Sequence, residues 1–204
     1  MELPVAGETL WKQLPEKVRN QIRKARRSGC RASVGGIELL HDFYAIFSEN
    51  MRDLGSPVHA AVLFSRLAEQ LAENCRVVVV YADTVPAAAM IFRCRDNLHN
   101  PWASSLRRYR PISPNMLLYW TMMSYGCESG YGRFDFGRSS PGASTCRFKL
   151  QWGATMEPLI WHVLSLSGEY WDPASESLEL EWWKGLSLAR SRRRGPALRR
   201  WISL

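Results

Sequence analysis

Apolar residues recur in the first part of the chain with the spacing of helices that pack one face against a core. Over residues 15–28, Val18, Ile22 and Ala25 fall on one stripe, a proline occupies the first turn, and Gly29 follows as a stop signal. This pattern predicts an amphipathic helix, and the face opposite the stripe is basic.

Two further amphipathic helices are predicted after a short strand at residues 31–34. The first covers residues 37–52 and the second residues 58–74, with a Leu-Gly-Ser-Pro break between them. Their apolar stripes are Leu40, Phe43, Tyr44 and Phe47 in the first helix, and Val62, Leu63, Leu67 and Leu71 in the second.

The most continuous apolar runs in the middle of the chain have the composition of buried strands. Residues 77–81 and 87–92 are rich in β-formers or small apolar residues, and the short segment at 82–86 ends in proline. Strands that are covered on both faces lose the alternation of apolar and polar positions. We therefore predict an antiparallel hairpin at the centre of a sheet.

The second half of the chain alternates between polar and apolar segments. A polar segment at residues 97–115 is predicted to be a loop. The elements predicted after it are a helix at 116–130, a strand at 134–136, a helix at 145–152, a strand at 159–166 and a helix at 179–190. This order predicts a mixed α/β fold with a largely antiparallel central sheet flanked by helices, as in the N-acetyltransferase (GNAT) superfamily.

The length of 204 residues fits a single domain over residues 1–204. Within it we distinguish a basic N-terminal helix at 1–30, a core at 31–172, and a C-terminal helix with an arginine-rich tail at 173–204. Hydrophobic residues at 46% and charged residues at 23% disfavour a disordered or membrane-embedded chain. Five cysteines without a CxxC pair and four isolated histidines predict a reducing, cytoplasmic setting and no metal site.

The net charge of +8 is concentrated near the C-terminus, where residues 190–204 contain six arginines and no acid. Such a tail either contacts phosphate on nucleic acid, anionic lipid or a nucleotide-linked substrate, or is simply solvated. The same two interpretations apply to the basic face of the helix at 15–28, formed by Arg19, Arg23, Lys24, Arg26 and Arg27.

A candidate anion site lies where the polar segment meets the helix that follows it. Ser113 has the position of an N-cap and Pro114 that of the first helical residue, so the helix N-terminus is available to an anion. Arg107, Arg108 and Arg110 precede it, and their guanidinium groups either bind a pyrophosphate or carboxylate or are solvated.

Asp135 and Lys149 are the candidate catalytic residues. Asp135 alternates with two phenylalanines, so it should leave the opposite face of its strand and serve either as a general base or as a partner for Arg138, Arg147 or a backbone turn. Lys149 stands beside aromatic residues and either stabilises an oxyanion or a leaving phosphate, or is a free surface lysine. The candidate substrate-binding residues are Trp102, Ser104, Ser105, Arg107, Arg108, Asn115, Tyr119, Arg138, Ser139, Arg147, Phe148 and Trp152.

Four sequence blocks together resemble one protein family. They are Pro-Trp-Ala-Ser-Ser-Leu-Arg at 101–107, Ser-Pro-Asn-Met-Leu-Leu-Tyr-Trp at 113–120, Phe-Asp-Phe-Gly-Arg-Ser-Ser at 134–140 and Arg-Phe-Lys-Leu-Gln-Trp-Gly-Ala at 147–154. With the basic segment at 14–29 and Pro-Ala-Leu-Arg-Arg at 196–200, the chain resembles the FemAB-related proteins associated with exosortase (PEP-CTERM) systems.

The resemblance implies a GNAT-like acyltransferase. The wider family includes the Fem transferases, which have two GNAT-like halves and transfer an amino acid from aminoacyl-tRNA to a peptidoglycan precursor. This chain resembles the C-terminal half of such a protein, and the family's phenylalanine-lysine motif matches Phe148 and Lys149. One departure is that no glycine occurs between Gly55 and Gly126, whereas acetyl-CoA acetyltransferases place a glycine-rich turn before the corresponding helix.

The resemblance therefore predicts direct acyl or aminoacyl transfer to an envelope, peptidoglycan or exopolysaccharide precursor. The donor would be acyl-CoA or aminoacyl-tRNA, with no tightly bound cofactor. Further predicted partners are an anionic inner-membrane surface, contacted through the arginines of 190–200, and a companion N-terminal GNAT-like domain. The alternatives are a basic module that binds nucleic acid or another anionic partner without chemistry, and a non-catalytic half-protein that assembles with its missing domain.

Overall fold

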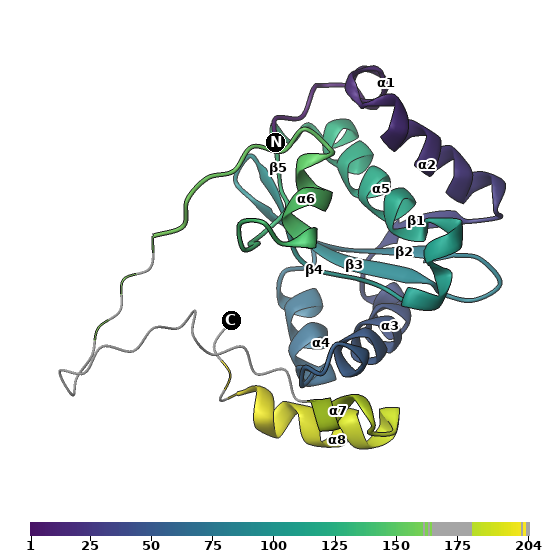
Figure 1. Cartoon of the computed structure of the whole chain (residues 1–204). Coiled ribbons are helices and arrows are strands. Elements are labelled where there is room, and N and C mark those ends of the chain that lie inside the picture. Colours follow the sequence, from purple (N-terminus) through teal and green to yellow (C-terminus); the bar gives the residue numbers. More distant parts are fainter. Residues whose placement is uncertain (161, 163, 165–180, 201, 203–204) are drawn as a thin grey trace.

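A five-stranded mixed sheet forms the centre of the computed structural model, which describes residues 1–160, 162, 164, 181–200 and 202 (Figure 1). The strands follow one another in chain order across the sheet, antiparallel except for the last pair, in which β4 and β5 are parallel. Their bounds are β1 Arg31–Gly35, β2 Cys75–Tyr81, β3 Ala87–Cys94, β4 Asn97–Ser105 and β5 Arg133–Asp135. The predicted mixed α/β fold is confirmed.

The predicted central hairpin is also confirmed, as the β2–β3 pair. Val78 is opposite Ala89, and both side chains are fully buried. Alternate residues of the two strands belong to different apolar clusters, since Val78 joins the cluster on one face and Val77 the cluster on the other. Burial on both faces explains why the two segments lack alternation in the sequence.

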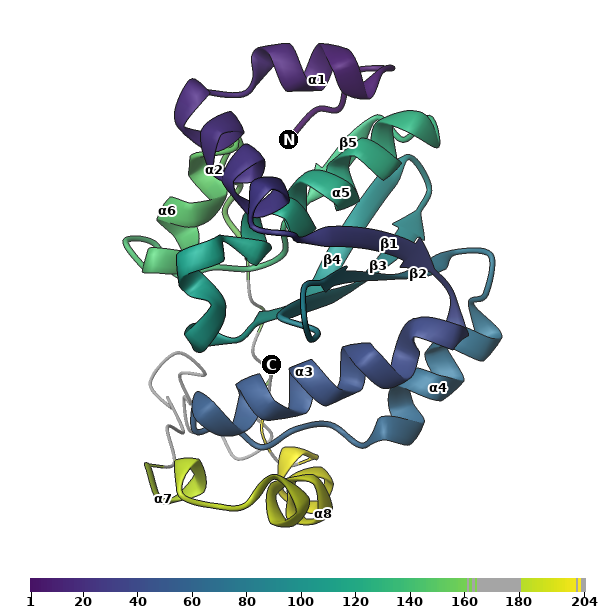
Figure 2. The same cartoon turned by 90° about the vertical axis from the view of Figure 1, so that its right-hand side faces the viewer.

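Helices cover both faces of the sheet (Figures 1 and 2). One face is covered by α5, with α1 and α2 lying over α5 and α6 beside it. The opposite face is covered by α3 and α4, and α8 lies on the far side of α3. The helical bounds are α1 Gly7–Gln13, α2 Glu16–Arg27, η1 Ile37–Leu39, α3 Leu40–Asp53, α4 Ala61–Gln70, η2 Arg107–Ile112, α5 Pro114–Glu128, α6 Ser144–Leu150, α7 Glu181–Lys184 and α8 Leu188–Arg199.

Helix α5 is buried around most of its circumference, because it lies between the sheet and the layer formed by α1 and α2. Leu118 and Met122 are fully buried, and even Trp120 is only 8% exposed. A helix in such a position needs apolar residues on every side, which is why its sequence shows little amphipathicity.

The prediction of a loop at residues 97–115 was wrong. Residues 97–105 form β4, which pairs with β3, and residues 107–112 form the short helix η2. Asn97, His99 and Asn100 give the strand a loop-like composition. Pro101 lies within the register shift of the β3–β4 pair, where a proline is tolerated. Pairing between strands thus overrides the local propensity.

Several predicted boundaries also need correction. The helix predicted at 58–74 is shorter, since α4 covers Ala61–Gln70, and the helix predicted at 179–190 is two helices, α7 and α8. Ser187 caps α8 by accepting a hydrogen bond from the Arg190 amide. Ser113 precedes α5 as predicted, but its φ is 56° and its side chain makes no capping hydrogen bond. Leu159 and Ile160 are not in a strand, and most of the rest of the strand predicted at 159–166 lies outside the described residues.

Helix α8 is docked on α3 by specific contacts, so the arginine-rich segment is not a frayed tail over Leu188–Arg199. Arg192 Nε donates to Ser48 Oγ at 2.8 Å, and Arg199 Nε lies 3.3 Å from His59 Nε2. Gly195 is so close to the chain that an added Cβ would lie 2.9 Å from backbone atoms of Val58. Within the described ranges, no helix combines the length and apolar character needed to cross a bilayer.

The outer edge of β5 is paired with the first residues of the chain. The Leu3 amide donates to the Gly132 carbonyl at 2.8 Å, and the Phe134 amide donates to the Met1 carbonyl at 2.9 Å. A short bridge between Glu2 and Arg133 completes this contact. The edge strand is therefore covered, which removes an exposed template for pairing with other chains.

Candidate active site

Strands β4 and β5 pair over only three residues and then separate. Their parallel register runs from Asn97 opposite Arg133 to His99 opposite Asp135, and the described residues show no pairing between the two strands beyond that point. On the other side of β4, the β3 register shifts between Met90 and Phe92. The separation leaves one edge of β4 without a neighbouring strand, and such an edge offers backbone groups to a ligand.

Asn100 stabilises the irregular part of β4. Its side chain is 4% exposed, and Nδ2 donates to the Met90 carbonyl at 3.0 Å and to the Trp102 carbonyl at 3.1 Å. A buried amide that satisfies two carbonyls fixes the shape of the strand where its ladder is interrupted.

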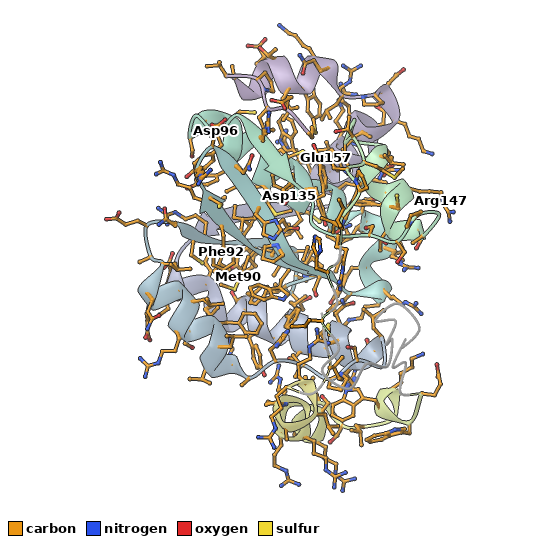
Figure 3. All side chains as sticks on the ribbon, turned by 90° about the vertical axis from the view of Figure 1, so that its left-hand side faces the viewer. Met90, Phe92, Asp96, Asp135, Arg147 and Glu157 are labelled. Atoms are coloured by element: carbon orange, nitrogen blue, oxygen red, sulfur yellow. The ribbon has the colours of Figure 1, made fainter. Side chains whose placement is uncertain are left out.

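Asp135 organises the turn that follows β5. One carboxylate oxygen lies 2.8 Å from His99 Nδ1, and the other accepts from the Gly137 amide at 2.7 Å. These hydrogen bonds, that of His99 first, lower the pKa of Asp135 to about 2 in spite of partial burial. Figure 3 shows Asp135 over the edge of the sheet, with Arg147 directed outward from α6.

Lys149 holds the same turn from α6. Its Nζ donates to the Gly137 carbonyl at 2.9 Å and to the Arg138 carbonyl at 2.8 Å. Burial lowers the pKa of Lys149, and the nearby charge of Asp135 opposes that shift. An ammonium group has three N–H donors, so these two contacts leave one for another acceptor. Lys149 is therefore a half-buried cation in a fixed position, and not a free surface lysine.

The aromatic residues near Lys149 pack between α6, α5 and the chain after β5. The Phe148 ring lies 4.9 Å from that of Tyr119, which stacks on Phe136 at 5.7 Å. Burial raises the pKa of Tyr119 to about 12, so its phenol is neutral. Trp152 is 1% exposed, and its Nε1, like Ser139 Oγ, is buried without a hydrogen-bond partner among the described residues. Unsatisfied polar atoms of this kind are uncommon in folded proteins and require an explanation.

Other predicted site residues lie on the opposite face of the sheet, against α3 and α4. The Trp102 ring contacts Phe64 at a centroid distance of 5.1 Å, Ser104 Oγ accepts from Asn50 at 3.2 Å, and Arg108 pairs with Glu49. Of the remainder, Arg107 is exposed on η2, Arg147 is exposed on α6, and Ser105 and Asn115 are half-buried.

The structure thus brings Asp135, the Arg138 backbone and Lys149 together, and separates Trp102, Ser104 and Arg108 from Lys149 by the sheet. The end of α8 lies near the Trp102 group, because Arg199 contacts His59, whose ring lies 6.1 Å from that of Trp102. Burial and the charge of Arg138 lower the pKa of Arg199. A separate hollow of about 350 Å³, on the face of the domain that α3 and α4 cover, is lined by residues of these two helices and by Arg192.

His99 is a further candidate site residue, which the sequence analysis missed. Its isolated position suggested no ligand role, and residues 97–115 were expected to form a loop. The contact with Asp135 depends on the register of two strands whose paired residues are 36 positions apart. The alternation of Leu98 and His99 along a strand is the one signal in the sequence that indicates the orientation of His99.

A family model described as "Acetyltransferase (GNAT) domain" matches residues 15–150. The chain belongs to the GNAT acetyltransferase family. It is therefore an acyltransferase, as predicted. A search of curated proteins returned no match to this chain.

Solved structures share the fold at low sequence identity. FemX has a TM-score of 0.65 and 14% identity, over 75% of this chain and 57% of that protein, so this chain spans little more than half of FemX. The aminoglycoside acetyltransferase AAC(6')-Iy, in complex with a CoA bisubstrate analogue, has a TM-score of 0.54 and 11% identity over 67% and 98% of the two chains. A ribosomal-protein-alanine N-acetyltransferase from Brucella melitensis biovar Abortus 2308 has a TM-score of 0.53 and 8% sequence identity, over 67% of this chain and 99% of that protein.

Proposed function

We propose that this GNAT protein transfers an acyl or aminoacyl group directly to an amine or hydroxyl of a cell-envelope, peptidoglycan or exopolysaccharide precursor. The observation that carries the proposal is the position of Lys149, a half-buried ammonium group fixed by two carbonyls where β4 and β5 separate. A preorganised cation at such a place stabilises the oxyanion that forms when a carbonyl is attacked. The resemblance of the Phe148–Lys149 block to the FemAB-related proteins supports the choice of acceptor class.

Direct transfer is favoured over a covalent intermediate by the surroundings of Lys149. Cys146, one turn earlier on α6, is buried, and its Sγ lies 3.5 Å from Met156 Sδ. A nucleophilic cysteine needs a cationic and accessible environment, so Cys146 has the character of a core residue. We therefore propose that donor and acceptor are bound together when the group is transferred.

We propose acyl-CoA as the donor, with aminoacyl-tRNA as the rival. The long helix α5 begins at Pro114 after the end of β4, and its N-terminus favours an anion. Arg107 is exposed on η2 just before it. The turn contains no glycine, but Ser113 adopts the left-handed conformation that glycine usually supplies.

Acetyl-CoA is expected to raise the melting temperature of the protein, because a ligand that binds the folded state alone stabilises it by about 2.7 kcal/mol at 100 times its Kd. Arg107→Glu should weaken this effect, since it places a negative charge beside the helix N-terminus. Thermal unfolding with acetyl-CoA, with ATP and with aminoacyl-tRNA measures this effect. Arg193→Glu, on the outer face of α8, is the matched control. A rise in melting temperature with aminoacyl-tRNA alone would identify aminoacyl-tRNA, and not acyl-CoA, as the donor. No rise with either compound would contradict the proposal.

We further propose that α8 binds the protein to an anionic membrane surface. Arg190, Arg193 and Arg194 are exposed, whereas Ser191 and Gly195 of the same helix are buried against the domain. Docking through α3 thus supports a fixed row of cations, whose attraction to an anionic surface is worth about 1 kcal/mol for each arginine.

Replacing Arg190, Arg193 and Arg194 together with glutamine should weaken binding to phosphatidylserine-containing vesicles by about 100-fold, from three contributions of about 1 kcal/mol. Vesicle sedimentation measures this binding. The same replacement of Lys24, Arg26 and Arg27, exposed on α2 at the other end of the domain, removes equal charge and should change it little. Equal losses in both variants would show unspecific charge attraction. Tighter binding to a nucleic acid duplex at the same salt concentration would favour the rival partner.

A further inference from the structure

His99 occupies the last residue pair before β4 and β5 separate. Its Nδ1 lies 2.8 Å from Asp135 Oδ2, its side chain is 38% exposed, and its Nε2 has no hydrogen bond to any residue that the structure describes. Because a carboxylate only accepts hydrogen bonds, the contact places the ring proton on Nδ1. The lone pair is then on Nε2, the nitrogen that has no partner within the domain as described.

The orientation of this ring is fixed by its surroundings. Asp135 cannot rotate freely, because its second oxygen accepts from the Gly137 amide, and Lys149 holds the carbonyls of the same turn. Gly137 has a φ of 69°, and an added Cβ would lie 3.1 Å from the Asn100 carbonyl and 3.8 Å from His99 Cε1. The backbone at Gly137 thus passes close to the imidazole ring of His99. The Asp135 carboxylate is restrained by His99 of β4 on one oxygen and by the Gly137 amide on the other.

The groups that face His99 come from three elements. Asp135 on β5 is its hydrogen-bond partner, Lys149 on α6 is the next charge beyond that carboxylate, and Phe92 is its register partner on β3. Directly paired residues leave the same face of a sheet, and Phe92 contacts Trp102 at 6.0 Å. His99 therefore leaves β4 on the Trp102 side. Lys149 comes from the other side, and it meets the His99–Asp135 pair where β4 and β5 separate, because it bonds the carbonyls of Gly137 and Arg138 directly after Asp135.

We propose that His99 is the general base of the acyl transfer and that Asp135 is its positioning residue. This inference rests on the proposed function, and it assigns the proton that leaves the acceptor. The acceptor nitrogen or oxygen attacks the thioester carbonyl carbon while its proton passes to His99 Nε2. The new C–N or C–O bond forms, the C–S bond breaks, and the proton is returned to the CoA thiolate, giving the free thiol.

Asp135 itself is poorly suited to accept that proton. A carboxylate with a pKa of about 2 is a weak base at neutral pH, and both of its oxygens already accept hydrogen bonds. Its charge instead stabilises the imidazolium that forms on His99. Among the residues predicted as catalytic from the sequence, Asp135 thus acts through a neighbour, and Lys149 serves the developing oxyanion.

The proposal predicts a rate effect that does not depend on knowing the natural acceptor, because water takes the same place when acetyl-CoA is hydrolysed. His99→Gln should slow thiol release from acetyl-CoA on the order of 100-fold, the range of general-base catalysis, while the Kd for acetyl-CoA measured by thermal shift stays unchanged. His41→Gln is the matched control, since the His41 side chain is 95% exposed on α3. Unchanged thiol release in a folded His99→Gln protein would overturn the proposal.

A second measurement tests the geometry without activity. Nitrogen NMR of the intact protein should show neutral His99 as the Nδ1–H tautomer, and Asp135→Asn should change that tautomer and shift the pH profile of thiol release. Diethylpyrocarbonate should modify His99, with acetyl-CoA protecting it and leaving His41 reactive. A proton on Nε2 of neutral His99 would overturn the proposed roles of His99 and Asp135, even if acetyl-CoA binds. Failure of acetyl-CoA to bind, with the tautomer as expected, would instead count against the proposed donor.

Discussion

Replacing Lys149 with methionine is expected to lower acyl transfer about 100- to 1,000-fold, the effect of removing one oxyanion donor of this type. Methionine keeps much of the length of the side chain and loses the charge and the donors. The Kd for acetyl-CoA should change less than the turnover, because the cation acts on charge that develops during the reaction. Thiol release from acetyl-CoA and a thermal shift on the same protein measure both quantities.

The same variant should also destabilise the fold, which the sequence alone would not predict. An exposed lysine costs little when replaced, but Lys149 satisfies the carbonyls of Gly137 and Arg138, and leaving such groups unpaired costs about 1 to 3 kcal/mol. Lys12→Met provides the control, because Lys12 is an exposed lysine on α1. If turnover persists while stability falls, Lys149 is a structural residue only and the proposed oxyanion role is wrong.

The largest loss of stability is expected from Phe64→Ala in α4, about 3 to 5 kcal/mol in the free energy of unfolding. Phe64 is fully buried, and its ring contacts those of Phe43, Phe47 and Trp102 at 5.1 to 5.2 Å. Removing it leaves a cavity between α3, α4 and the sheet that these rings cannot fill without breaking their own contacts. Urea unfolding at fixed pH measures the change.

Val62→Ala on the same helix is the comparison for Phe64→Ala. Val62 is 60% exposed, so its truncation should stay within about 0.5 kcal/mol. A loss in Phe64→Ala as small as that in Val62→Ala would mean that α4 contributes little packing to the core.

Elements whose neighbours are apolar on all sides could be predicted from sequence. The β2–β3 hairpin and α5 are covered by other elements, so most of their residues are apolar. This composition is visible in the sequence without knowledge of the neighbouring elements. β4 was missed because its polar residues make specific hydrogen bonds within the fold: Asn100 bonds two carbonyls and His99 bonds Asp135. A segment with such residues has the composition of a loop unless its pairing is known.

The candidate site could be predicted only in part for a related reason. Asp135 and Lys149 stand in local motifs, and the structure places them around one turn. The contact between His99 and Asp135 follows from strand register, and the division of Trp102 and Lys149 between two faces follows from the layers. Neither depends on local spacing, so neither could be read from neighbouring residues.

The short parallel pairing of β4 and β5 also affects the order in which the protein folds. The hairpins β2–β3 and β3–β4 join neighbouring segments, whereas β5 reaches its place only after the chain has passed through η2 and α5. Contacts between distant segments require the closure of long loops and form slowly. Because β5 is also paired with residues 1–3, this last strand joins the first residues of the chain to a segment far along the sequence. We therefore expect the His99–Asp135 contact to be among the last to form. A partly folded chain would then lack the positioned general base and would not react with a thioester before folding is complete.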